Sequence, residues 1–278
     1  RSNNYLLRAP DAFPQCDYLI VESTYGDRLH QNKQLSEDEL LRIIKHTCLE
    51  KKGKLIIPSF AIGRTQEIVY ILNNFYNEGK LPLIPIYVDS PLAVNATNIF
   101  RLHLDLFNKD VAEVLEHDDD PFGFGTLKYI TNVNHSKALN ARKEPCIIIS
   151  ASGMMEAGRV KHHIANNIDN PKNSILAIGY CAPTTLGARI LRGEKEISIH
   201  GMPHQVNAEI FSIDAFSGHA DYQEMEQYLR CQNPEKVKKV FIVHGDYEAQ
   251  VPYSKVLEKA GFKDIVIPKP GETFKIEN

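Results

Sequence analysis

Three residues of this sequence carry side chains suited to proton transfer or metal binding, and each follows an apolar segment. Glu22 and His244 directly follow apolar runs typical of buried strands, and His219 follows a third apolar stretch. The strands of an open α/β sheet end at a shared edge, and ligands bind there. We therefore expect Glu22, His219 and His244 to converge at one edge of a sheet.

The residue types define the chemistry that such a cluster could perform. A carboxylate next to an imidazole orients the ring and favours its protonated form, so Glu22 and His219 would make a general acid near neutral pH. His244 would add a second imidazole, the side chain that most often binds zinc. The alternative, that each side chain only caps its own loop, is equally compatible with the sequence.

The residues around His219 predict a turn that leads into a helix. Ser217 and Gly218 favour a turn. Asp221 is a suitable N-cap for a helix over Tyr222–Cys231. The first backbone N–H groups of a helix have no partner within it, so they favour an anion. His219 would then lie at an anion-binding position.

Several predicted helix starts carry a glycine beside an arginine or a serine. The pairs are Gly63–Arg64, Ser152–Gly153 and Gly158–Arg159. A helix N-terminus attracts anions, and a guanidinium group binds phosphate oxygens through two parallel hydrogen bonds. Together, these positions predict a groove lined for phosphate groups.

The segments between Glu22 and His219 alternate between helix and strand patterns, which predicts a mostly parallel sheet covered by helices. Apolar spacing predicts helices over 36–53, opened by a capping box at Ser36, and over 66–76. Apolar runs predict strands at Lys54–Pro58, Leu83–Val88, Cys146–Ser150, Ile175–Tyr180, Glu196–His200 and Ile265–Pro268.

The composition limits the class of protein and the type of partner. The 278 residues are 43% hydrophobic and 24% charged, which is typical of a globular protein with a sizeable core. No apolar run approaches the roughly 18 residues of a membrane span, so we expect no membrane association. With a net charge of −3, a polyanion would have to bind through a local basic cluster. The five cysteines are scattered without a C-x-x-C pair, which indicates a reducing, cytoplasmic environment.

Five motifs that contain the candidate residues follow one another along the chain. They are Val21–Gly26, Pro58–Glu67, Ser150–Met154, Phe216–Asp221 and Val243–Asp246. In this order they resemble the β-CASP branch of the metallo-β-lactamase superfamily, which includes RNA-processing nucleases such as ribonuclease J and the messenger-RNA 3′-end cleavage endonuclease. The resemblance spans nearly the whole chain. It implies an α/β fold in which a β-CASP domain, a mostly parallel sheet flanked by helices, is inserted into a partial metallo-β-lactamase domain of the αββα type.

The resemblance also implies domain boundaries and substrate contacts. Residues 1–26 and 215–278 would belong to the metallo-β-lactamase domain, and residues 27–214 would form the β-CASP domain that helps to hold the RNA. The residues expected to contact a single-stranded RNA are Arg64, Ser150, Ser152, Gly153, Arg159 and Ser217.

By the same resemblance, Glu22 and His219 would act together at the scissile phosphate, where His219 protonates the leaving group. His244 would be a direct ligand of zinc. The reaction implied is hydrolysis of an RNA phosphodiester by metal-activated hydroxide, and the full enzyme would hold two zinc ions.

The sequence departs from the family pattern in its metal ligands. Family members bind zinc mainly through a His-x-His-x-Asp-His motif, a further histidine and a bridging aspartate, all before the motif of Glu22, and none of these occurs here. We therefore expect a C-terminal portion of a zinc-dependent RNA hydrolase, which binds no catalytic zinc by itself and is inactive. Its truncated sheet would expose an apolar edge through which homo-oligomers could form.

Two other classes of function stay open. The same fold could serve as a non-catalytic RNA-binding scaffold, although a scaffold has no need of Glu22 and His219 as an acid pair. A nucleotide-binding α/β domain would suit the Gly–Arg turns. The sequence, however, has neither G-x-G-x-x-G nor G-x-x-x-x-G-K-[ST].

Overall fold

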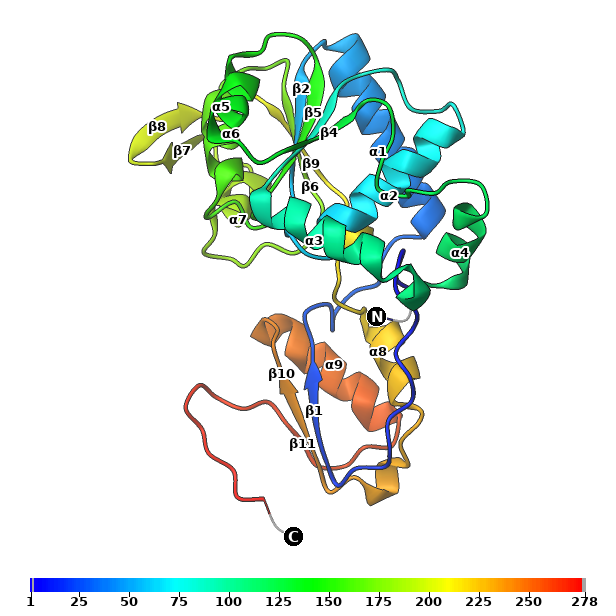
Figure 1. The fold of residues 1–278 in the computed structure, drawn as a ribbon. Coiled ribbons are helices and arrows are strands. Elements are labelled where there is room, and N and C mark those ends of the chain that lie inside the picture. Colours follow the sequence, from blue (N-terminus) through cyan, green and yellow to red (C-terminus); the bar gives the residue numbers. More distant parts are fainter. Residues whose placement is uncertain (2, 277–278) are drawn as a thin grey trace. The chain divides into compact units, whose positions relative to one another are not determined.

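The computed structural model describes residue 1 and residues 3–276. By their contacts, these residues form two compact units. Unit 1 contains Arg1–Asn4, Arg8–His30 and Gly218–Asn278, and unit 2 contains Tyr5–Leu7 and Gln31–Ser217. Each unit combines a sheet with helices (Figure 1).

Unit 2 is built on a six-stranded sheet in which all neighbouring strands are parallel, in the order β4-β3-β5-β2-β6-β9. The strands are β2 (Lys54–Pro58), β3 (Ile86–Asp89), β4 (Leu127–Ile130), β5 (Cys146–Ser150), β6 (Ser174–Ala177) and β9 (Glu209–Ser212). The strands β2, β3, β5 and β6 are buried along their whole length. Such burial is what a parallel sheet covered on both faces requires.

Helices cover both faces of this sheet, with a separate apolar core on each (Figure 1). They are α1 (Lys33–Lys45), α2 (Arg64–Asn77), α3 (Pro91–Leu102), α4 (Lys109–Leu115), α5 (Val133–Ala141), α6 (Arg159–Asn167) and α7 (Leu186–Leu191). Leu55 and Ile57 of β2 enter the core with α1 to α4, whereas Ile56 enters the core with α5 to α7. Because neighbouring side chains of a strand point to opposite faces, the two helix groups lie on opposite sides. The expected parallel sheet between helices is confirmed.

The first helix of unit 2 begins earlier than the sequence predicts. Asn32 is its N-cap, because its side chain accepts a hydrogen bond from the backbone N–H of Gln34. Ser36 lies inside the helix and donates its hydroxyl to the carbonyl of Asn32, so the predicted capping box is wrong. A cap depends on backbone conformation, and Asn32 satisfies the preference for such residues as well as Ser36 does.

Short elements complete unit 2. A π-helical segment, η1 (His46–Glu50), continues α1, and the 3-10 turns η2 (Leu104–Leu106) and η3 (Asp214–Phe216) connect longer elements. The strands β7 (Glu196–Ile199) and β8 (Met202–Gln205) form an antiparallel hairpin. Sequence analysis did not identify β4, α4, α5 or β8.

Unit 1 contains a three-stranded parallel sheet in the order β1-β10-β11, with helices packed against it (Figure 1). Its elements are β1 (Tyr18–Glu22), α8 (Tyr222–Leu229), the 3-10 turn η4 (Pro234–Lys236), β10 (Lys239–Val243), α9 (Tyr247–Lys259) and β11 (Ile265–Val266). Val240, Ile242 and Tyr253 are buried in the core that joins the sheet to α8 and α9. β1 lies at one edge of the sheet.

The sequence-based placement of His219 at a strand end of this same sheet is wrong. The apolar stretch before it forms β9, which pairs with β6 in unit 2, and η3 follows β9. An apolar pattern indicates a buried strand, but it does not say which sheet the strand joins.

None of the helices within residues 1 and 3–276 combines the length and apolar character needed to span a bilayer.

Candidate functional site

The three candidate residues come together within unit 1. Glu22 is the last residue of β1 and pairs in register with Val243 of β10, so His244 lies just beyond it on the neighbouring strand. His219 reaches the same position from the loop that precedes α8. Its Nδ1 lies 3.0 Å from Oε2 of Glu22, and Nδ1 of His244 lies 3.9 Å from that oxygen. The expected convergence of the three side chains is observed.

The turn at His244 is held in an unusual backbone conformation. Its φ of +52° lies in the left-handed region, which is costly for a residue with a Cβ and occurs mostly where surrounding contacts enforce it. Those contacts come from the end of β1. Ser23 donates its hydroxyl to the carbonyl of Val243 at 2.8 Å, and Thr24 donates to the carbonyl of His244 at 3.1 Å. A Cβ on Gly245 would lie 2.5 Å from Oγ of Ser23, so this close approach needs glycine.

The loop that carries His219 is fixed from two sides. On one side, Glu22 accepts the backbone N–H of Ala220 at 3.3 Å in addition to the imidazole. On the other side, His30 uses Nε2 to donate to the carbonyl of His219 at 2.9 Å. The predicted N-cap of the next helix is confirmed, because Asp221 and Glu224 form a capping box.

Sequence analysis missed His30. Its backbone N–H donates to the carboxylate of Asp221, and its ring lies 4.6 Å from that of Tyr25. No strand end or repeat marks His30 in the sequence. Its position eight residues after Glu22 in the same motif region is the only signal that could have singled it out.

The charges at the site follow from these contacts. Burial alone would raise the pKa of Glu22, but hydrogen bonds from His219 and Thr24 and the charge of His219 lower this pKa to about 2. Glu22 is therefore ionised at neutral pH. Burial and the nearby charge of Arg1 lower the pKa of His30, which keeps this ring neutral. Because a carbonyl can only accept, the single proton of the neutral His30 ring resides on Nε2.

The three side chains at this site are of the types that bind zinc in catalytic centres. Glu22, His219 and His244 each offer a ligand atom within 4.8 Å of the others, and this is the single group of that kind among the described residues. Two imidazoles and a carboxylate match the three protein ligands of many catalytic zinc sites. In this arrangement, however, Oε2 of Glu22 and Nδ1 of His219 bind each other. With these two atoms engaged, the three side chains do not by themselves complete a zinc site.

The residues predicted to contact RNA gather at the carboxyl ends of two adjacent strands of unit 2, with one exception. Arg64 follows β2, and Ser150, Ser152, Gly153 and Arg159 end or follow β5, its direct neighbour. Ser217, the exception, follows η3 and is buried. Two of these residues, Arg64 and Arg159, form ion pairs with other residues of unit 2.

Arg64 and Arg159 are both ion-paired. Arg64 is nearly buried and donates to Glu67 one turn along α2. Arg159 donates to the buried carboxylate of Asp89 at 2.6 Å and to the carbonyl of Thr131 at 2.5 Å. Their guanidinium groups therefore hold the ends of the strands in place, which restricts how they could meet a substrate.

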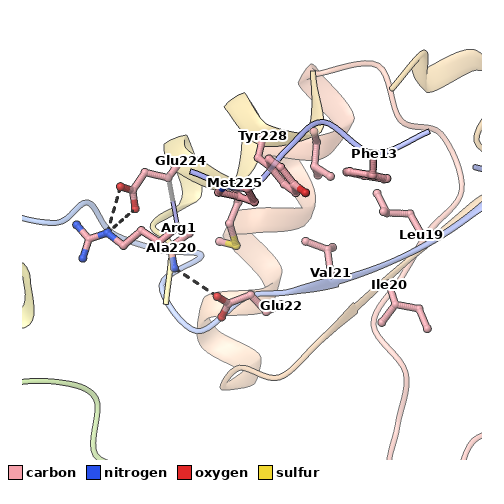
Figure 2. A pocket seen from close by; sticks show the side chains of 12 residues that line it. Arg1, Phe13, Leu19, Ile20, Val21, Glu22, Ala220, Glu224, Met225 and Tyr228 are labelled. Carbon is pink, nitrogen blue, oxygen red and sulfur yellow. Dashed lines mark hydrogen bonds and ion pairs between the residues drawn. The ribbon is translucent and has the colours of Figure 1, made fainter. Parts of the chain in front are cut away.

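A cavity of about 400 Å³ lies next to Glu22 within unit 1. Figure 2 shows Glu22 at this cavity together with the ion pair between Arg1 and Glu224, at 3.1 Å. Its other walls are mostly apolar and include Phe13, Leu19, Val21, Met225 and Leu229. The cavity shares only Glu22 with the cluster of acid and imidazole groups, so the two are chemically distinct.

Two family models match the chain. The Beta-Casp domain matches residues 65–190, and the Zn-dependent metallo-hydrolase RNA specificity domain matches residues 203–268. Ribonuclease TTHA0252 of Thermus thermophilus is 32% identical over 96% of the chain and 60% of its own length. An RNase J-like protein of Methanocaldococcus jannaschii is 34% identical over 98% of the chain and 62% of its own length. The transcription termination factor FttA of the same organism is 30% identical over 95% of the chain and 42% of its own length.

The parallel α/β fold and these matches define a protein of the metallo-hydrolase class that is related to RNA-processing proteins. Within that class, the chain belongs to the β-CASP branch of the metallo-β-lactamase superfamily. It spans less than two thirds of the length of the relatives named above.

Proposed function

We propose that this chain contributes the proton-donating pair and one metal ligand to a zinc-dependent phosphodiesterase that hydrolyses RNA. The observation that carries the proposal is the contact of 3.0 Å between His219 and Glu22, made next to His244 at the end of two parallel strands. The similarity to proteins named ribonucleases supports RNA as the substrate class.

Each of the three residues has a separate role in this proposal. Glu22 is ionised and accepts a hydrogen bond from the Nδ1–H of His219. His219 would then donate a proton to the departing oxygen from its other ring nitrogen, Nε2. His244 would hold a zinc ion, which supplies hydroxide at neutral pH by lowering the pKa of bound water. His30 keeps the loop of His219 in place through its backbone carbonyl.

The substrate contacts and domain roles are part of the same proposal. Residues 27–214 would form the β-CASP domain, and residues 1–26 and 215–278 would belong to the metallo-β-lactamase domain. A single-stranded RNA would pass the loops after β2 and β5, which favours Ser152 and Gly153 over the ion-paired arginines as points of contact. Five free cysteines support a cytoplasmic location.

We also propose that the chain by itself retains no catalytic zinc and does not hydrolyse RNA. Glu22 and His219 bind each other, and His244 alone cannot provide the four ligands that zinc takes. Elemental analysis after dialysis should find well under one zinc per chain, with no difference between the wild type and His244→Ala. Stoichiometric zinc in the wild-type chain, or RNA cleavage by the chain alone, would contradict this.

The catalytic role is tested in the full-length protein with His219→Ala. If His219 donates the proton, the cleavage rate should fall by about 10²–10⁴-fold while RNA affinity stays nearly unchanged. Lys255→Ala, at an exposed position on α9, serves as the control. A full-length wild type that binds RNA without cleaving it would instead identify a scaffold.

A further inference from the structure

Phe60 is a large aromatic residue that stays substantially exposed in an otherwise well-fixed loop. It lies just after β2 in unit 2, and 45% of its surface is exposed. Burial of such a side chain stabilises a fold, and this position partly forgoes that gain. Single exposed apolar residues are common on protein surfaces, so exposure alone does not mark Phe60 as a binding residue.

The ring of Phe60 lies with one face against the backbone of Gly153. A Cβ built on Gly153 would be 2.9 Å from both Cδ2 and Cε2 of the ring and 3.4 Å from Cζ. A point in the ring plane outside the Cδ2–Cε2 bond would be much farther from Cζ, so these distances put Gly153 over the face of the ring. Any larger residue at 153 would displace it. Gly153 thus covers part of one face of the ring, and 45% of the surface of Phe60 nevertheless stays exposed.

The backbone that carries the ring is fixed by a dense set of hydrogen bonds. The carbonyl of Phe60 accepts from the hydroxyl of Thr65 at 2.7 Å and from the N–H of Thr65 at 3.2 Å. The N–H of Ser59 donates to the carbonyl of Ser150 at 2.9 Å, which ties the two loops together. The ring is thus held in one position before any ligand arrives, and binding need not order it.

The position of Phe60 in the fold is one where ligands bind. β2 and β5 are parallel neighbours, but the helices that follow them, α2 and α6, pack on opposite faces of the sheet. The two loops at their carboxyl ends therefore diverge, and such a point is where open α/β sheets bind ligands.

We propose that Phe60 is a stacking platform for a nucleobase of a single-stranded RNA. Gly153 allows the ring to lie in this position because it has no side chain to displace it. This inference rests on the proposed RNA substrate and names one subsite of it. A planar base stacks on the exposed part of the ring. Stacking needs no particular base, so the subsite tolerates different sequences.

The test measures binding of the 278-residue chain to labelled oligonucleotides by fluorescence anisotropy at fixed salt. One probe is a single-stranded RNA of twelve nucleotides, and the other has the same backbone without bases. Phe60→Ala should weaken binding of the first probe by about tenfold and leave binding of the second unchanged. Phe60→Trp should restore binding, whereas Phe60→Leu, which keeps apolar bulk, should not.

Two further variants separate stacking from loss of structure. Gly153→Ala should weaken binding of the base-containing probe because its Cβ displaces the ring. Leu102→Ala removes a side chain on α3 that is 78% exposed, and binding should not change. Circular dichroism checks that each variant is folded.

The possible outcomes distinguish this inference from the function on which it rests. RNA binding that is equal in the wild type and Phe60→Ala overturns the platform and leaves the proposed function standing. Equal losses with both probes would also overturn it, since the effect would then concern the backbone. If the wild type binds neither probe, both the platform and the RNA-binding role of this unit are refuted.

Discussion

Two carboxylate–imidazole pairs in this protein have the same chemistry and opposite surroundings. In unit 1, Glu22 and His219 are 3.0 Å apart, with side chains 31% and 37% exposed. In unit 2, Asp89 and His163 are 2.6 Å apart, and both side chains are 0% exposed. Only the first pair was predicted from the sequence, although Glu22 ends the strand β1 and Asp89 ends the strand β3.

The partners of the buried pair account for all its polar atoms. Asp89 also accepts from Arg159 at 2.6 Å and from Ser136 at 2.5 Å, and Nδ1 of His163 contacts the side-chain oxygen of Asn140 at 2.8 Å. These residues belong to β3, α5 and α6, so the pair joins three elements. A substrate cannot reach it. Accessibility, and not the pairing itself, separates a structural pair from a candidate catalytic one.

The comparison predicts its largest effect for Asp89→Ala. Removing this carboxylate leaves the buried His163 without its hydrogen-bond partner and Arg159 without its counter-charge, which typically costs about 3–5 kcal/mol of unfolding free energy. Glu22→Ala in the exposed pair should cost about 1 kcal/mol or less. Urea denaturation of each variant measures the difference. The matched control is Asp169→Ala, which breaks the surface pair with His204.

Equal costs for Asp89→Ala and Asp169→Ala would remove the distinction between buried and exposed pairs. In that case, the hydrogen bonds around Asp89 would contribute little beyond those of an ordinary surface contact.

Acid pH should act through both pairs, because the pKa of Glu22 and that of Asp89 are lowered in the folded state. Burial alone would raise the pKa of Asp89, but hydrogen bonds from His163, Ser136 and Arg159 hold it below its ordinary value of 3.8. A lowered folded-state pKa gives stability that is present above 3.8 and is lost as the pH falls through the folded value. Asp89→Asn should therefore flatten the fall of unfolding free energy below about pH 4. An unchanged acid slope would show that other carboxylates control it.

The support of the exposed pair can be tested at His30. His30→Ala removes the hydrogen bond to the carbonyl of His219 and should cost about 1 kcal/mol. His30→Gln keeps an N–H donor on a side chain of similar reach and should recover part of that loss. Denaturation at pH 7 measures both variants. A cost for His30→Gln as large as that for His30→Ala would mean that ring packing against Tyr25 matters more than the donor.

The smallest effect is expected at His46 on the surface of unit 2. Hydrogen bonds to Glu50 and Glu209 raise the pKa of His46 above its ordinary 6.5. A raised folded-state pKa gives stability that is present below 6.5 and is lost as the pH rises through the folded value. His46→Gln should remove this dependence, which amounts to about 0.2–1 kcal/mol. Unfolding measured at pH 5.5 and pH 8.5 detects it, with His135→Gln as the control.

Some elements could be predicted because their pattern is local. Cys146–Ser150 is apolar almost throughout, and it forms β5 with the predicted bounds because a strand buried on both faces leaves such a run. β4 (Leu127–Ile130) is only partly buried and carries a lysine, so no run marks it. The start of α1 was misplaced because Asn32 and Ser36 are both good caps, and only backbone geometry decides between them.

The candidate site was predictable to a similar degree. Glu22 and His244 lie at the ends of neighbouring parallel strands. Parallel strands end at a shared edge of their sheet, so two apolar runs could predict that these residues lie close together. The chain reaches His219 from a strand of another sheet, and the hydrogen bond from His30 joins residues 189 positions apart. No local pattern encodes either contact.

The sequence by itself determined the family, the parallel α/β class and the positions of residue types suited to proton transfer or zinc binding, because motifs and apolar runs are written in consecutive residues. The tertiary structure decided which carboxylate–imidazole pair is exposed, which sheet each strand joins and that Phe60 stays partly exposed against Gly153. Those properties depend on contacts between residues distant along the chain, and the free energy of such contacts arises only when the core is packed.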